Sequence, residues 1–207
     1  MMAMAELLAS GQLWQGEAAA SRVTAEERLA TGWPWLDQQL LAGGWPPRAL
    51  IELLVDAPGQ GELRLLSRAL AGLAEDRRWQ LWINPPATPY PPALRAAGVA
   101  LERQLLTLDL SPALALWSAE QGLASGSCSL VLAWLPHLEL AQLRRLQLAA
   151  ERGQCRCFAI RPAALACQPS PAAVRLQLQR VAGGLQLTLL KRRGGWPLPP
   201  AIWPQVS

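Results

Sequence analysis

The chain has 207 residues, 51% of them apolar, with a net charge of +4 and a mean hydropathy of +0.13. This length and composition predict one globular domain with tails and exclude a largely disordered chain. No apolar run reaches the roughly 18 residues that a membrane span needs, and the N-terminus has no evident secretory signal. We therefore expect a cytoplasmic protein without membrane contact.

The positive charge is concentrated in the last third of the chain. Residues 1–76 hold ten acids and five bases (−5), residues 77–139 hold four of each, and residues 140–207 hold one acid and ten bases (+9), which sums to +4. A basic segment of this kind favours an acidic partner, either nucleic acid or an acidic protein surface.

The cysteines and the single histidine do not suggest a metal site. No two cysteines form a C-x-x-C pair, and only His137 could add an imidazole ligand, so we expect no zinc. We predict reduced thiols, with Cys128 and Cys155 buried in strands. His137 has only Glu139 as a local carboxylate and no nucleophile nearby, which indicates a solvated loop histidine.

The first 48 residues are expected to precede the sheet, with residues 31–48 as a lead-in to its first strand. Residues 1–30 suggest a short helix and a weakly ordered stretch, with Trp14 as its best anchor. In residues 31–48, Leu36, Leu40 and Leu41 share one face of a short helix that Gly43 and Gly44 end. A strand is then expected over residues 49–55.

The following pattern alternates between helical and strand periodicity. Helices are expected at 61–76, 93–97, 111–124 and 138–152, and strands at 78–83, 104–108, 128–134 and 155–160. This alternation predicts an α/β fold in which a mostly parallel sheet is flanked by helices. Apolar and polar residues alternate strictly in residues 174–180 and 185–189, which predicts a C-terminal antiparallel hairpin with one solvent-exposed face.

The end of the chain is predicted to be a separate segment. Residues 191–207 are basic and rich in proline, so we expect them to continue as neither strand nor helix and to be mobile. The expected organisation is an N-terminal segment (1–30), one domain (31–190) and a basic tail (191–207).

The turn after the first strand has the order of a phosphate-binding loop but lacks its chemistry. The frame G-x-x-x-x-G-K-[ST] places Asp56 at the first glycine, Gly61 at the second, Glu62 at the lysine and Leu63 at the hydroxyl residue. A carboxylate repels phosphate, and leucine cannot coordinate magnesium. We expect no nucleotide cofactor and no metal, and a loop kept as scaffold because Gly59 and Gly61 still make the strand-to-helix turn.

The second nucleotide-binding motif is also missing. The strand at 128–134 continues through Leu135 and Pro136 without the carboxylate that would hold a metal ion through water. The two defects are independent, and no other catalytic constellation replaces them. The sequence therefore predicts a protein that is not an enzyme and has no ATPase activity.

Ten tryptophans and the basic tail supply candidates for partner binding. For Trp33, Trp35 and Trp45, which lie near prolines, packing under loops and exposure at an interface both fit. The candidate partner-binding residues in the tail are Lys191, Arg192, Arg193, Trp196 and Trp203. With Arg175 and Arg180 of the hairpin they could form a basic surface, for which a solvated tail, a protein contact and a weak DNA contact remain open.

Many short sequence motifs, taken in their order along the chain, resemble the RecA-like family. They resemble more closely the ImuA group of translesion-synthesis accessory proteins, which is also described as SulA-like. The resemblance spans about residues 31–195, and its main stretches are Thr31–Glu52, Ala57–Leu65, Arg78–Trp82, Pro89–Leu94, Leu116–Gln121, Val131–Pro136, Leu143–Leu148, Arg161–Pro162 and Leu190–Gly195. The cell division inhibitor SulA shares only the middle, about residues 62–162.

The ImuA resemblance implies a RecA-like, P-loop-type core and a non-catalytic adaptor of SOS-induced translesion DNA synthesis. Its implied partners are an ImuB-type, Y-family polymerase-like protein and an error-prone polymerase III alpha-type subunit, with RecA as a further candidate. The SulA resemblance implies the alternative, a division inhibitor that binds FtsZ, the tubulin-like division protein. The segments outside 62–162 favour the ImuA interpretation.

Overall fold

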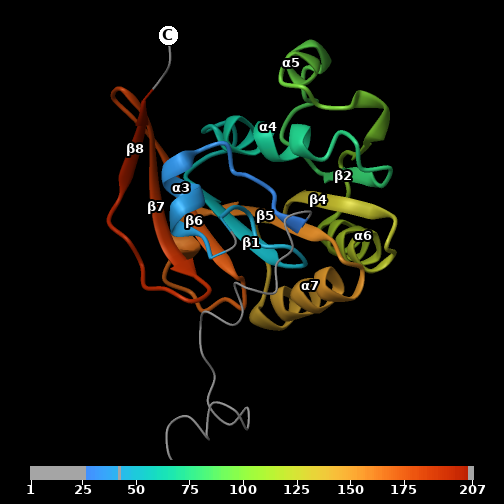
Figure 1. Ribbon diagram of the computed structural model, residues 1–207. Helices are drawn as coiled ribbons and strands as arrows, with labels where there is room; N and C mark the ends of the chain where they lie inside the picture. Colours follow the sequence, from blue (N-terminus) through green and yellow to red (C-terminus); the bar gives the residue numbers. More distant parts are fainter. Residues whose placement is uncertain (1–26, 42, 205–207) are drawn as a thin grey trace, which may run out of the picture.

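The structure is a computed structural model that describes residues 27–41 and 43–204 (Figure 1). The predictions for the N-terminal segment, including Trp14 as its anchor, fall almost entirely outside these residues. Within them, no helix is both long and apolar enough to cross a membrane.

One sheet of eight strands, in the order β3-β2-β4-β5-β1-β6-β7-β8, forms the centre of the molecule. The strands are β1 (Leu50–Val55), β2 (Trp79–Ile83), β3 (Gln104–Thr107), β4 (Cys128–Trp134), β5 (Arg156–Pro162), β6 (Val174–Val181), β7 (Gly184–Arg192) and β8 (Ala201–Pro204). Strands β1 to β6 pair in parallel, whereas β7 and β8 are antiparallel to their neighbours. The predicted α/β class, mostly parallel sheet and C-terminal hairpin are confirmed.

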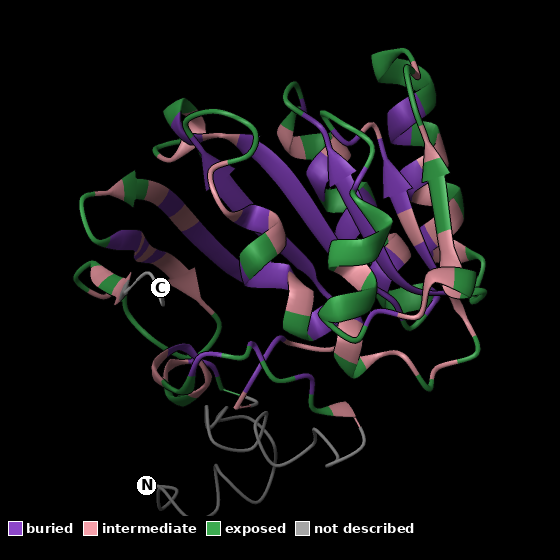
Figure 2. Cartoon of the chain, turned by 90° about the horizontal axis from the view of Figure 1, so that it is seen from above, coloured by how far each residue is buried: buried purple, intermediate pink, exposed green. Residues whose placement is uncertain are grey.

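Helices cover both faces of this sheet, as Figure 1 shows. They are α3 (Pro34–Gln39), α4 (Glu62–Gly72), α5 (Pro91–Ala96), α6 (Pro112–Ala124) and α7 (Leu140–Arg152), with short 3₁₀ turns at Leu101–Arg103 and Ala163–Leu165. One apolar cluster joins α3 and α4 to one face, and a second joins α6 and α7 to the other. The central strands are buried along their length between more exposed outer strands (Figure 2).

Two predicted helices end earlier than their apolar pattern suggests. Helix α3 ends at Gln39, because the backbone of Leu40 is already extended, and Leu41 is 38% exposed instead of sharing the buried face. Helix α4 ends at Gly72 and not near residue 76. There the carboxylate of Asp76 accepts the N–H of Arg78 at 2.9 Å, which favours a turn into β2 over a further helical turn.

The prediction of a mobile tail that forms no strand is wrong for the described residues. Strand β7 continues to Arg192, the N–H of Leu198 donates to the carbonyl of Leu189 at 3.1 Å, and β8 pairs with residues 184–187 of β7. Two physical reasons explain this order. Leu198 and Trp203 pack against the main apolar cluster, and prolines are tolerated in an edge strand, whose outer side needs no N–H donor.

Candidate functional site

The loop between β1 and α4 uses its own side chain where a nucleotide-binding loop would use a phosphate. Glu62 is the first residue of α4 and is 1% exposed. Its Oε1 accepts the N–H of Gly59 at 2.7 Å, and its Oε2 accepts the N–H of Gly61 at 3.1 Å. Backbone N–H groups at a helix start normally attract anions, and here an internal carboxylate already occupies them.

The remaining loop residues also make structural contacts. Gly61 has φ +115°, and a Cβ added to it would lie 3.2 Å from Leu185 Cδ2 of β7, so the loop is closely covered from that side. Gln179 Nε2 donates to Asp56 Oδ2 at 3.3 Å, and Leu63 packs against the apolar core. The residues that break the nucleotide motif thus stabilise the loop, and the described residues contain no group of side chains that could hold a metal ion.

A buried ionic cluster on the α7 side of the sheet was not predicted from the sequence. Glu52 of β1 is fully buried and bonds Arg161 of β5 through Oε1 and Arg175 of β6 through Oε2, the latter at 2.7 Å. Arg175 also donates to three carbonyls of the segment after β5, those of Leu165, Ala166 and Gln168. The only available signal was a lone acidic residue within the apolar run of β1.

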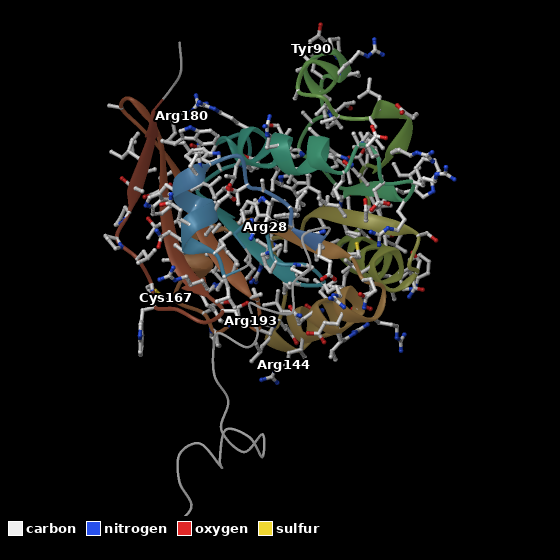
Figure 3. All side chains as sticks on the ribbon, viewed as in Figure 1. Arg28, Tyr90, Arg144, Cys167, Arg180 and Arg193 are labelled. Atoms are coloured by element: carbon white, nitrogen blue, oxygen red, sulfur yellow. The ribbon has the colours of Figure 1, made fainter. Side chains whose placement is uncertain are left out.

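The tail candidates and the hairpin arginines do not form one basic surface. Arg175 does not contribute to an exposed basic surface, because its guanidinium is buried against Glu52. Arg180 lies near the hairpin turn and Arg193 beyond the far end of β7 (Figure 3). Arg175 and Arg180 are five positions apart along β6, or about 17 Å.

Two of the three basic tail residues already make contacts within the chain. Lys191 Nζ donates to the Ser170 carbonyl at 2.7 Å, and burial lowers the pKa of Lys191, with Arg175 adding to the effect. Arg192 Nη1 donates to the Gln39 carbonyl at 2.6 Å. Arg193 is the exposed member of the three.

The aromatic candidates also divide into packed and exposed residues. Trp203 is half-buried, with its ring edge-on to Trp33 and the Arg64 guanidinium carbon 4.6 Å from its ring centroid. Trp45 is fully buried against Phe158, so packing, and not exposure at an interface, applies to Trp45. Trp196, by contrast, is 86% exposed.

An exposed apolar surface lies at the β3 edge of the sheet, opposite the β8 edge. It consists of residues on β3, just after β3 and on α6: Leu105, Leu108, Leu114 and Trp117. We call it the β3–α6 surface. Leu105 is the strand neighbour of Leu81, and a Cβ on Gly122 of α6 would meet the Leu81 side chain, so α6 borders the face that carries Leu105.

The outer side of β3 also offers backbone groups to a partner. Strand β3 pairs only with β2 in the described sheet, and such an edge presents N–H and C=O groups that can pair with another chain. Exposed apolar patches on this kind of edge mark protein interaction sites. The sequence signal was Leu105-Leu106, a break in the alternation expected for a half-buried strand.

Comparison with known proteins identifies the family. The family model described as "Cell division inhibitor SulA" matches residues 50–157, just over half of the chain, from β1 to the start of β5. The chain belongs to the SulA family.

Individual SulA proteins match over the same part of the chain. The cell division inhibitor SulA of Edwardsiella piscicida is 39% identical over 90 residues, 44% of this chain and 54% of that protein. That of Photorhabdus laumondii is 31% identical over 118 residues, 57% of this chain and 67% of that protein. The chain thus spans between half and two thirds of these relatives. The crystal structure of SulA from Pseudomonas aeruginosa matches at 35% identity with a TM-score of 0.46, covering 54% of this chain and 97% of that one.

These matches correct the function expected from the sequence. The translesion adaptor hypothesis rested on the segments outside residues 62–162, but the family match covers residues 50–157 and the relatives are named as division inhibitors. The physical basis of the error is that short sequence motifs near prolines and glycines also stabilise local structure. In residues 31–37, for example, the Thr31 N–H donates to Asp37 Oδ1 at 2.8 Å, and Thr31 Oγ1 accepts the Trp33 N–H at 3.1 Å.

Proposed function

We propose that this protein is a cell division inhibitor of the SulA type. The observation that carries the proposal is the family match over residues 50–157, together with relatives named as cell division inhibitors. The SulA resemblance implies FtsZ as the target, and a cytoplasmic location and SOS control are further parts of the proposal.

The inhibitor acts by binding and not by catalysis. The loop that would bind a nucleotide in a RecA-like protein is filled by the Glu62 carboxylate and covered by Leu185. A RecA-like ancestry of the core is consistent with this retained strand–loop–helix order, in which the loop now serves as scaffold.

The target binds at the β3–α6 surface. This surface combines an unpaired strand edge with exposed leucines and Trp117, which is 58% exposed, and it lies wholly within the family-matched residues. Aromatic and apolar anchors of this kind carry most of the binding energy in protein interfaces.

Regulated expression in a bacterial host tests the proposal through cell length. We expect the wild-type protein to produce filaments. Leu105→Asp should abolish filamentation, because a charge in the centre of an apolar interface weakens binding by several kcal/mol. Leu148→Asp is the matched control, since Leu148 is 63% exposed on α7, outside the β3–α6 surface, and should leave filamentation intact.

Cells of normal length at high levels of folded wild-type protein would refute the function. Filamentation by the Leu105→Asp protein at wild-type level would instead refute the proposed binding surface. Circular dichroism of each purified variant separates loss of binding from loss of folding.

A further inference from the structure

The connection between β3 and α6 is tied to the sheet by the side chain of Asn84, the residue directly after β2. Its Nδ2 donates to the Leu110 carbonyl at 2.7 Å, and its Oδ1 accepts the Leu110 N–H at 2.9 Å. One side chain thus pairs with both backbone groups of a single residue, as a residue of an antiparallel strand would. We call this pair of hydrogen bonds the Asn84 clamp.

The backbone of Asn84 has the conformation that the clamp requires. Its φ is +49°, in the left-handed region where asparagine and aspartate are enriched among non-glycine residues. Its N–H donates to the Thr107 carbonyl of β3 at 2.9 Å, which places the amide side chain beside the chain that leaves β3. An amide group offers a donor and an acceptor together, whereas an ionised carboxylate only accepts.

The Asn84 clamp holds a segment that carries part of the β3–α6 surface. The exposed Leu108 lies two residues before Leu110, and Leu110 itself packs against the apolar cluster of α6 and α7. Ser111 follows as the N-cap of α6, and its Oγ accepts the N–H of the exposed Leu114 at 3.4 Å. The clamp therefore fixes Leu108 and the first turn of α6 relative to the sheet.

We propose that Asn84 is a positioning residue for target recognition, an inference that rests on the proposed binding of FtsZ at the β3–α6 surface. Asn84 acts through the clamp and not through contact with the target. The clamp holds Leu108 and Leu114 in place beside Leu105 of β3, so that these side chains are ordered before the target binds. A surface that is ordered only on binding loses affinity, because the ordering costs conformational entropy.

A clamp that only stabilised the fold would have a different effect. It would change the fraction of unfolded protein but not the affinity of each folded molecule for the target. The capping box at the start of α7 supplies a matched comparison, because it also fixes the start of a helix on the same face of the sheet. There Gln142 Oε1 accepts the Glu139 N–H at 2.8 Å, and neither residue belongs to the β3–α6 surface.

Binding of the full-length protein to immobilised FtsZ tests the positioning role, with the folded fraction of each variant taken from urea denaturation. Asn84→Gly tolerates the positive φ but removes both bonds of the clamp, and should weaken binding by about tenfold per folded molecule. Asn84→Asp keeps the acceptor for the Leu110 N–H but loses the donor, and should weaken binding by about threefold or more. Gln142→Ala should leave the affinity within about twofold.

Amide hydrogen exchange of the free protein gives a second measurement that does not depend on the target. We expect faster exchange over residues 108–114 in Asn84→Gly than in the wild type, because the connection opens more often without the clamp. Gln142→Ala should leave exchange in these residues unchanged. Equal exchange over residues 108–114 in Asn84→Gly and the wild type would overturn the proposal.

The binding results separate this inference from the proposed function. Absence of saturable binding by the folded wild type would refute the proposed function and this inference with it. Wild-type affinity in both Asn84→Gly and Asn84→Asp would refute the positioning role alone, and so would equal losses in Asn84→Gly and Gln142→Ala. If Asn84→Gly fails to fold, Asn84→Asp decides, and failure of both variants to fold would assign Asn84 to the fold and not to recognition.

Discussion

Glu62 determines what the loop after β1 can bind. A lysine at this position would attract phosphate, but the carboxylate accepts the same backbone N–H groups that a phosphate would need. It also places a negative charge at the start of α4, where the helix dipole favours one. The Glu62 carboxylate therefore stabilises the loop and occupies the N–H groups that an external anion would need.

Replacing Glu62 tests this stabilising role. Glu62→Ala should lower the free energy of unfolding by about 1–2 kcal/mol, because two N–H groups lose their acceptor. Glu62→Gln, which keeps an acceptor oxygen, should lose less. Glu75→Ala is a control at a more exposed position and should stay within about 0.5 kcal/mol. Urea denaturation measures all three, and equal stability of Glu62→Ala and the wild type would contradict the role.

The buried thiols make stability sensitive to alkaline pH. Burial raises the pKa of Cys157 from 9.0 to about 12 and raises the pKa of Cys155 well above its usual value. Because the unfolded chain loses these protons first, the contribution of each thiol to stability is complete below about pH 9. It is lost as the pH rises towards the folded pKa. Burial lowers the pKa of Arg156 to about 10, which acts in the opposite direction only above that pH.

Cys157→Ala isolates this effect. Between pH 7.5 and pH 10 the wild type should lose free energy of unfolding, and Cys157→Ala should lose about 1 kcal/mol less over the same interval. The comparison uses the change with pH within each protein, so the cavity left by the sulfur cancels. Parallel pH profiles for the two proteins would show that the Cys157 thiol does not ionise on unfolding in this range.

Among the structural elements, the two edges of the sheet differ in how they meet solvent. The segment that leads into and forms β8 contains four prolines, at positions 197, 199, 200 and 204, which discourage pairing with another strand. The β3 edge has no proline and carries Leu105 and Leu106. The open edge for strand pairing is therefore β3.

The three strands β1, β5 and β6 are joined by the ionic cluster around Glu52. Glu52→Ala should lower the free energy of unfolding by about 3–5 kcal/mol, because it leaves two buried guanidinium groups unpaired. A triple variant that removes all three charges at once, Glu52→Leu with Arg161→Met and Arg175→Met, should recover only part of this loss, because it leaves the carbonyls that the two arginines bond without their donors.

An ion pair with an exposed arginine provides the matched control for the ionic cluster. Glu120→Ala removes the partner of Arg145, whose side chain is 62% exposed, and should lower the free energy of unfolding by less than about 1 kcal/mol. Urea unfolding of these variants and the wild type decides the matter. A Glu52→Ala loss as small as that of Glu120→Ala would contradict the importance of the buried cluster.

The sequence predicts elements better than it predicts contacts between them. A mostly apolar run was sufficient for β1, the Ser111-Pro112 start for α6, and strict alternation of apolar and polar residues for the β6–β7 hairpin. It was insufficient for β8, whose prolines indicate a loop until β7 supplies a neighbour, and for Arg175, whose partner Glu52 is 123 residues away. Such pairings depend on the strand order, which no local pattern contains.

For the whole molecule, the family match and the proposed binding surface coincide. The β3–α6 surface lies within the family-matched residues 50–157. Strands β6, β7 and β8 follow these residues in the chain, and β8 forms the opposite edge of the sheet. The proposed binding of FtsZ therefore uses the edge that lies farthest from β8.

The most direct test adds the purified protein to FtsZ and measures polymer formation by sedimentation together with GTP hydrolysis. We predict that both decrease as the protein approaches equimolar amounts with FtsZ, because a bound inhibitor removes subunits from assembly. Leu105→Asp should lose this effect, and Leu148→Asp should keep it. Unchanged polymer and unchanged GTP hydrolysis in the presence of excess folded wild-type protein would contradict the proposed function.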